Sequence, residues 1–257
     1  MLPDIQDETD ARGIELNEVG ISGLRYPIEF VDGQIAQGGV AEFEVIVRLP
    51  ADRRGTHMSR MIELTHDHLQ RFDPRDLPVV LKNFAAKLEV DVCEVRTSFP
   101  LAIEVKSPVS ERTSWQAGDL RFEAAINEGI FQSAMAMTTQ VTSLCPCSKA
   151  ISDYGAHNQR SDVTLQVFAD GDDPYPLSAM SAFEFIRSVG SCPVFPIVKR
   201  SDERAITMTA FDHPAFVEDM ARDLSTAMRT LNLPHRVSVK NLESIHSHDA
   251  VARLAWL

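Results

Sequence analysis

The apolar and polar positions along the chain predict two successive rounds of strands and helices. The clearest strand runs from Val40 to Leu49, where apolar side chains alternate with mostly charged ones at the period of two expected of a half-buried strand. Pro100 is expected to divide a later strand-like run in two. The predicted elements of the first round are a strand at 40–49, helices at 58–72 and 76–88, and strands at 89–99, 101–106 and 119–126.

The second round repeats the order of the first without repeating its residues. Its predicted elements are strands at 131–144 and 163–168, helices at 179–189 and 214–231, and strands at 236–242 and 250–254. Pro214 is expected in the first turn of the last helix, where a proline is tolerated. The pattern predicts an α+β fold of two ββααββ units, each with an antiparallel sheet flanked by a helix pair. Uncovered sheet edges need partners, so a homo-oligomer is expected.

Length and composition agree with a globular protein of this kind. The chain has 257 residues, of which 44% are apolar and 24% charged, enough for a sizeable core in one or two domains. We divide it into a flexible N-terminus (1–15), a first unit (16–128) and a second unit (129–257) with most of the candidate active-site residues. No run is long and apolar enough for a membrane helix, and the N-terminus is acidic where a signal peptide would be basic. A cytoplasmic location is therefore expected.

The net charge argues against two classes of partner. A formal charge of -12 opposes binding to nucleic acid or to an anionic membrane, because both are held mainly by Lys and Arg. An anionic small molecule is still compatible with this charge if basic residues gather locally. The candidates for such a pocket are Arg53, Arg54, Arg160, Lys199 and Arg200.

Four cysteines are too few for a disulfide scaffold in a chain of this length, so all are expected to be reduced. Cys93 lies in an alternating run and Cys192 precedes a proline, and both are expected to be small buried side chains. Cys145 and Cys147 differ from them, because they share the segment 144–162 with a lysine, a histidine and an arginine.

The two thiols at 145 and 147 are separated by one residue, whereas zinc ribbons and thioredoxin-like sites have two between theirs. Neither motif is therefore met. Two interpretations of Cys145 remain: a nucleophilic or metal-binding thiolate that acts with His157, or a buried thiol in a rigid loop shaped by proline and glycine.

A second cluster of polar side chains follows the strand predicted at 236–242. Glu243, His246, His248 and Asp249 lie close together in the sequence. Carboxylate and imidazole groups suit Zn²⁺, Mn²⁺ or Fe²⁺, and a thiolate from elsewhere in the chain shifts the preference toward zinc. An exposed polar turn is the alternative interpretation of this cluster.

Composition alone gives other candidates less weight. Glu203 is expected in a charged turn, and Glu218 is expected to be a surface acid of the last helix. His57 lies in a strand-to-helix turn, where free backbone N–H groups can face phosphate. The histidines expected to be solvated are His66, His213 and His235.

Taken together, these segments resemble the type IB GTP cyclohydrolase I family. The resemblance extends over nearly the whole chain, through NEVGISGLRYPIEF, RGTHMSR, CPCSKAISDYGAHNQRSD, KRSDE, FVEDMARD and NLESIHSHDA. It implies a bimodular tunnelling fold and a homotetramer with active sites at subunit interfaces. It also implies the conversion of GTP and water to formate and 7,8-dihydroneopterin triphosphate, the first step toward folate-type pterins. Ala150 departs from the family, since many relatives carry Glu there.

The resemblance implies a metal site and a reaction. Cys145 matches the family's essential cysteine and is expected to bind a divalent metal ion together with Glu203, Glu243 and His246. Mn²⁺ or Zn²⁺ is the expected ion, and Fe²⁺ is the alternative. In the implied mechanism a metal-activated water attacks C8 of the purine, His157 transfers protons as the imidazole ring opens, and a second hydration releases formate.

The resemblance also implies substrate contacts. Glu218 matches the carboxylate that binds the guanine edge, whose two N–H donors one carboxylate can accept together. Arg160, Ser161 and His57 are candidates for the triphosphate, and Cys147 and His248 have no assigned role. Two rivals are weighed against this function: a nitrile reductase of the same fold, which would use NADPH and needs no metal cluster at 243–249, and a non-catalytic metal- or nucleotide-binding protein.

Overall fold

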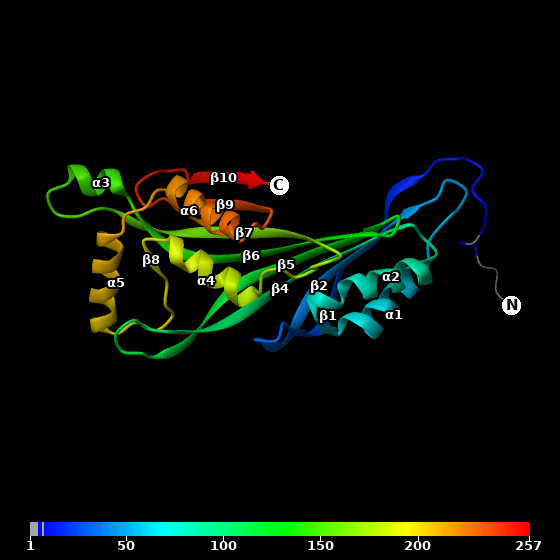
Figure 1. The fold of residues 1–257 in the computed structure, drawn as a ribbon, viewed down its shortest axis with the longest axis horizontal. Coiled ribbons are helices and arrows are strands. Elements are labelled where there is room, and N and C mark those ends of the chain that lie inside the picture. The colour runs from blue at the N-terminus through cyan, green and yellow to red at the C-terminus, as the bar shows by residue number, and fades with distance from the viewer. Residues whose placement is uncertain (1–4, 7) are drawn as a thin grey trace. The chain divides into compact units, whose positions relative to one another are not determined.

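The computed structural model describes residues 5, 6 and 8–257 of the chain as a mixed α+β protein (Figure 1). The expected flexible N-terminus falls partly on residues 1–4 and 7, which lie outside the described residues. Within the described part, Thr9 pairs with Arg53 in an isolated bridge, and Asp10 N donates to Asp52 O at 2.9 Å.

Long strands provide most of the framework. They are β1 (Leu16–Val31), β2 (Ala36–Leu49), β4 (Val92–Lys106), β5 (Thr113–Asn127), β6 (Ile130–Leu144), β7 (Asn158–Asp170), β9 (His235–Asn241) and β10 (Ala250–Trp256), with the two-residue strands β3 (Arg71–Phe72) and β8 (Cys192–Pro193). In the described residues these ten strands hydrogen-bond in the order β10-β9-β7-β6-β5-β4-β2-β1-β3, and β8 pairs with β6.

Six α-helices accompany the strands in the described part of the chain. They are α1 (Met58–Leu69), α2 (Leu77–Leu88), α3 (Pro146–Ile151), α4 (Ala179–Val189), α5 (Arg200–Asp212) and α6 (Val217–Thr230), and one 3-10 turn, η1 (Pro74–Asp76), precedes α2. None of the described helices is long and apolar enough to cross a membrane.

Residues pack into two compact units that are not successive in the sequence. One contains the described residues up to Phe99 with Arg121–Met135 and Ala169–Pro176, and the other contains Pro100–Leu120, Ala136–Phe168 and Leu177–Leu257. The predicted division at 128/129 separates two repeats of a strand and helix pattern, whereas the compact units are defined by which residues pack together. The division therefore stays a prediction.

The first unit is built around a cluster of phenylalanines. Phe30, Phe72, Phe99 and Phe122 have ring centroids 5.1 to 6.4 Å apart, and all four rings are buried. Burying a side chain of this size stabilises the fold by about 1.5–3 kcal/mol. Helices α1 and α2 lie side by side in Figure 1, and α1 packs on β1.

In the second unit α6 packs on β9 and β10 and against α4 (Figure 1). Met220, Leu224 and Met228 recur every four residues along α6 and are each fully buried, so they form an apolar stripe at helical spacing. His235 at the start of β9 is also fully buried and contacts Leu233 O and Ser225 Oγ, both at 2.8 Å. The expectation that His235 is solvated was therefore wrong, because a β-strand places it beneath α6.

Two predicted boundaries were wrong because of proline. Pro100 does not divide β4, whose pairing with β2 ends at Ser98, so the missing N–H of Pro100 removes no hydrogen bond from that ladder. Pro214 lies before α6, since the helix begins at Val217 and the amide of Phe216 donates to the Asp219 carboxylate at 3.0 Å. Pro214 belongs instead to the short connection between α5 and α6.

Two of the longer elements, β1 and α5, were not predicted, and neither were the short elements β3, η1, α3 and β8. Strand β1 precedes the residue at which the first strand was expected, and helix α5 replaces the charged turn expected around Glu203. Only Asp202 and Ala210 of α5 are fully buried, so the helix carries no apolar stripe that a sequence pattern can reveal.

Candidate active site

Cys145 stands where β6 ends and α3 begins. It is the N-cap residue of α3, and its sulfur accepts a hydrogen bond from Ser148 N at 3.4 Å. Its own amide donates to His157 O at 3.0 Å. The Cys145 side chain is half-buried, whereas Cys147 is exposed on the first turn of α3. Cys145 and His157 are therefore joined through the backbone although twelve positions separate them.

His157 is held by hydrogen bonds from both its backbone and its ring. Its amide donates to Ser148 Oγ at 3.3 Å, and its Nδ1 lies 2.7 Å from Oε1 of Gln159, a buried residue of β7. Ser244 Oγ donates to the same oxygen at 3.4 Å. Sequence reasoning missed Gln159, because a neutral amide between two charged candidates carries no signal of its own.

The second sequence cluster forms the loop between β9 and β10. Leu242 N donates to Arg160 O at 2.9 Å, which fixes the start of this loop beside β7. Glu243 is half-buried, and the exposed rings of His246 and His248 stack with centroids 5.2 Å apart.

Asp249, at the end of that loop, forms an ion pair with a lysine of β9. Its carboxylate accepts from Lys240 Nζ at 2.9 Å, and this hydrogen bond, with a smaller one from the Glu243 backbone, lowers the pKa of Asp249. The carboxylates of the cluster thus differ, because Asp249 already has a cationic partner within the chain.

A buried polar network lies under the loop. Asn241 Nδ2 donates to Ser143 Oγ at 3.0 Å, and Ser161 Oγ donates to Asn241 Oδ1 at 2.5 Å. Ser143 Oγ in turn donates to Ala215 O at 2.7 Å, so the network connects β6, β7 and β9 to the α5–α6 connection. Ser161 has a structural partner here instead of an exposed hydroxyl, and its contact with the triphosphate stays a prediction.

Glu203 lies on the first turn of α5 next to a buried carboxylate. Asp202 accepts hydrogen bonds from Val109 N at 2.9 Å, Ser110 N at 2.8 Å, Ser110 Oγ at 2.6 Å and Lys199 N at 2.9 Å. Burial by itself raises the pKa of Asp202, but these hydrogen bonds outweigh it and hold the pKa well below its usual range. The Glu203 side chain is exposed, on a helix end that Asp202 attaches to the β4–β5 turn.

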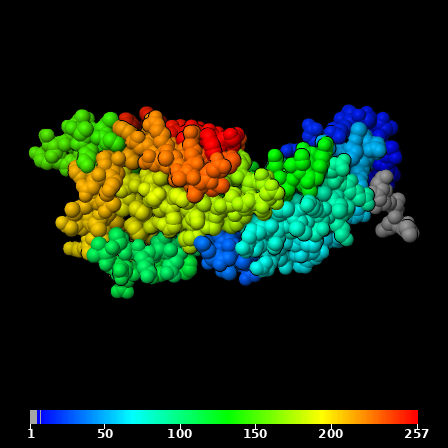
Figure 2. All heavy atoms as spheres, viewed as in Figure 1, coloured from blue at the N-terminus to red at the C-terminus, as the bar shows by residue number. Residues whose placement is uncertain are grey.

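Glu218 lies on the first turn of α6, with its side chain exposed as the sequence suggested. The connection just before it is tied to the segment that carries Cys145, because Ala215 N donates to Leu144 O at 3.1 Å. Lys149 Nζ of α3 also donates to Phe211 O at the end of α5. In Figure 2 the green atoms of α3 and the orange atoms of α5 lie next to one another at the surface.

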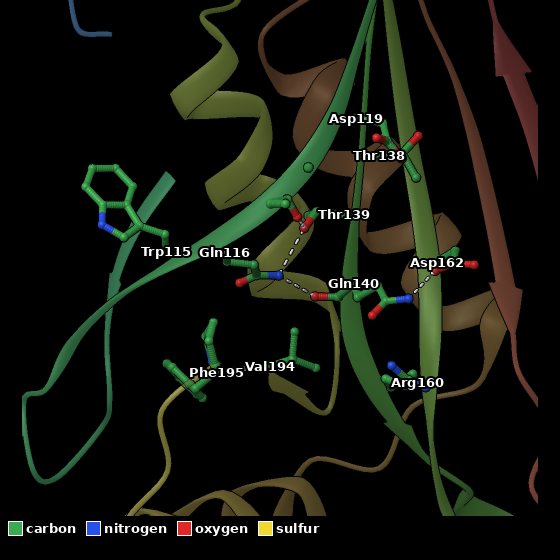
Figure 3. A pocket seen from close by; sticks show the side chains of 13 residues that line it. Trp115, Gln116, Asp119, Thr138, Thr139, Gln140, Arg160, Asp162, Val194 and Phe195 are labelled. Atoms are coloured by element: carbon green, nitrogen blue, oxygen red, sulfur yellow. Dashed lines mark hydrogen bonds between the residues drawn. The ribbon is translucent and has the colours of Figure 1, made fainter. Parts of the chain in front are cut away.

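Arg160 contributes to a cavity of about 530 Å³ in the second unit (Figure 3). Trp115, Gln116, Gln140 and Asp162 are among its other lining residues, and Gln140 Nε2 donates to Asp162 Oδ1 at 2.8 Å. Arg160 therefore projects from β7 into a mixed polar and apolar hollow that the carboxylates of Asp119 and Asp162 also line. His57, the remaining candidate for the triphosphate, belongs to the first unit, where it is the N-cap residue of α1.

Among residues 5, 6 and 8–257 of one chain, no three His, Cys, Asp or Glu side chains are grouped so that they can hold a metal ion. The proposed ligands Cys145, Glu203, Glu243 and His246 therefore do not form a closed site within a single chain. Their role as ligands stays a prediction. The chain does connect Cys145, His157 and the 242–249 loop through hydrogen bonds.

Comparison with known proteins identifies the family. The family model described as type I GTP cyclohydrolase folE2 matches residues 2–252. The chain belongs to this family. GTP cyclohydrolase FolE2 2 of Dechloromonas aromatica is 38% identical to this FolE2 family member over 257 residues, which cover 98% of this chain and 93% of the relative. GTP cyclohydrolase FolE2 of Fervidobacterium nodosum is 36% identical over 257 residues, covering 99% and 97% of the two chains.

Solved structures show that this FolE2 family member shares its fold with distant proteins. The uricase of Arthrobacter globiformis has a TM-score of 0.50 at 9% identity and covers 93% of this chain and 92% of its own. The uricase of Bacillus fastidious has a TM-score of 0.51 at 10% identity, covering 96% and 94%. At these identities the likeness concerns the fold alone.

Proposed function

We propose that the protein is a GTP cyclohydrolase that converts GTP and water to formate and 7,8-dihydroneopterin triphosphate, at the start of tetrahydrofolate and pterin biosynthesis. Family membership over nearly the full chain carries this proposal. It is supported by the hydrogen-bonded arrangement of Cys145, His157 and the loop at 242–249, since a thiol, an imidazole and a carboxylate are the groups that this hydrolysis needs. A cytoplasmic location belongs to the same proposal.

The donor set fits a divalent metal ion in its chemistry. Thiolate, carboxylate and imidazole from Cys145, Glu203, Glu243 and His246 suit Zn²⁺ or Mn²⁺, with Fe²⁺ as the alternative. When bound, such an ion would polarise a water molecule so that the water attacks C8 of the purine near neutral pH. His157 is not among the four donors, and this leaves its imidazole available for proton transfer.

We further propose that the site is completed between chains of a homotetramer with a bimodular tunnelling fold. Exposed apolar side chains on the elements that carry candidate ligands support this, because exposed apolar surface marks sites of association. Met208 and Phe211 of α5 are 46% and 39% exposed, and Ile245 of the ligand loop is 65% exposed. The structural similarity of the chain to the uricases is also consistent with a tunnelling fold.

The chain's own residues would bind and orient the substrate. Glu218, on the exposed first turn of α6, would accept both N–H donors of the guanine edge in a bidentate contact. Arg160 would neutralise charge on the triphosphate, and His57 and Ser161 are the other candidates for contact with it. His157 would take up and return protons while the imidazole ring opens and formate leaves.

The test measures formate and, after oxidation, fluorescent pterin released from GTP. Metal-free protein is expected to be inactive and to recover with Mn²⁺ or Zn²⁺. Cys145→Ala is expected to abolish formate release, whereas Cys147→Ala, which removes the exposed neighbouring thiol, is expected to retain it. Full activity of Cys145→Ala would refute the assignment of the site, and turnover of a nitrile with NADPH would favour the reductase instead.

A further inference from the structure

Gln159 is placed between the two segments that carry the candidate chemistry. It is the second residue of β7, its side chain is buried, and its Oε1 lies 2.7 Å from His157 Nδ1. The same oxygen accepts from Ser244 Oγ at 3.4 Å, in the loop that carries Glu243 and His246. One amide oxygen thus contacts both segments.

The chemistry of that oxygen decides which ring nitrogen of His157 carries hydrogen. An amide oxygen can only accept, so Nδ1 must donate a hydrogen to form the 2.7 Å contact. A neutral imidazole has a single N–H, and if it lies on Nδ1 then Nε2 presents a lone pair. With the amide oxygen on this side, the Ser244 hydroxyl also donates to it, so one orientation of the Gln159 amide satisfies both contacts.

The position of the His157 backbone does not depend on this contact. His157 N donates to Ser148 Oγ, and His157 O accepts from Cys145 N. Gln159 Oε1 instead fixes the ring, in both its rotation and its tautomer. Partners that fix the tautomer and orientation of a metal-bound imidazole typically contribute about 10- to 100-fold to metal affinity or activity, and we expect an effect of the same order for the His157 ring.

We propose that Gln159 is a positioning residue that holds His157 with hydrogen on Nδ1, so that Nε2 accepts a proton as the imidazole ring of GTP opens. This inference rests on the proposed function for its catalytic consequence. The tautomer itself is a property of the chain that can be measured without turnover. In the proton transfer, Nε2 would gain a proton while the Nδ1–H to Oε1 hydrogen bond is kept, so that the imidazolium has a ready acceptor.

The first experiment reads the tautomer by NMR. The full-length chain is labelled with ¹⁵N-histidine and kept with Zn²⁺, which is diamagnetic, at about pH 8.5, well above the ordinary histidine pKa of about 6.5. His157→Asn identifies the His157 signals. The wild type is expected to show hydrogen on Nδ1. Gln159→Met, which removes the acceptor but keeps the length of the side chain, is expected to shift the signals toward hydrogen on Nε2.

Two further variants separate positioning from a general loss of packing. Gln159→Glu keeps an acceptor oxygen and is expected to restore the Nδ1–H form. Gln116→Met replaces another buried glutamine, in β5, and is expected to leave the His157 signals unchanged. A wild-type His157 with hydrogen on Nε2, or signals that do not respond to Gln159→Met, would overturn the proposal.

The second experiment measures turnover of GTP. Gln159→Met is expected to lower kcat by about 10- to 100-fold with a smaller change in KM, since the ring acts in the chemical step. A kcat within about twofold of the wild type would overturn the catalytic consequence. A wild type that shows the Nδ1–H form but releases no formate would instead refute the proposed function, and the tautomer assignment would stand.

Discussion

Replacing Asn241 by alanine should destabilise the protein more than its small loss of apolar surface suggests. Its side chain is 4% exposed and bridges Ser161, which is 0% exposed, to Ser143, which is 1% exposed. Alanine would leave the Ser161 hydroxyl without its acceptor inside the protein, at a cost of about 1–3 kcal/mol. Ser143 would keep its hydrogen bond to Ala215 O and lose only the one that it accepts from Asn241. That loss would cost about 0.5–1.5 kcal/mol. The expected total is about 1.5–4.5 kcal/mol.

Urea unfolding followed by circular dichroism measures this free energy. Protein concentration must be fixed, because association of chains adds to the apparent stability. Asn127→Ala is a matched control, since Asn127 ends β5 with an exposed side chain, and its change should stay within about 0.5 kcal/mol. In a protein that already carries Ser161→Ala, Asn241→Ala should lower the free energy of unfolding by at least about 1 kcal/mol less than it does in the wild type. A loss below about 0.5 kcal/mol for Asn241→Ala, or full additivity with Ser161→Ala, would refute the reasoning.

Two other predictions concern ionisation. Because hydrogen bonds hold the folded-state pKa of Asp202 below its usual range, its contribution to stability is complete above about pH 4 and is lost as the pH falls through that lower pKa. Asp202→Asn should therefore be less stable at pH 7 and show a weaker acid dependence in urea titrations; equal acid dependence would contradict the assignment. Burial raises the pKa of Cys93 to about 12, so iodoacetamide at neutral pH should alkylate the exposed Cys147 in the native protein and Cys93 only after unfolding. Peptide mass mapping checks this, and labelling of native Cys93 at the rate of Cys147 would disprove it.

The elements with a regular apolar period could be predicted from the sequence. Helix α4 spans Ala179–Val189 as expected, and the stripe of α6 faces the core as its spacing required. Helix α5 could not be predicted in this way, because its attachment depends on a buried carboxylate, Asp202, whose partners lie about ninety positions away. The prediction that His235 is solvated was wrong for a similar reason, since the ring is buried only because α6 packs over it in the folded protein.

The residues of the candidate site likewise differ in whether the sequence alone could reveal them. Cys145, His157 and Glu243 stood out because thiols, imidazoles and carboxylates are conspicuous in a short segment. Gln159 did not, because its importance lies in one oxygen that receives hydrogen bonds from two segments far apart in the sequence. Family resemblance supplied Glu218, whose exposed helical position has no chemical signature of its own.

The bond between Cys145 N and His157 O closes the segment between them at its base. The segment from 146 to 156, which begins with α3, thus has its two ends hydrogen-bonded together, and its outer part carries Ile151 and Tyr154, which are 86% and 100% exposed. The spacing of thiol and imidazole is set at this base and not by the length of the segment beyond it. Evolution or design can therefore lengthen, shorten or rewrite the outer part to suit another surface while the reactive pair stays in register.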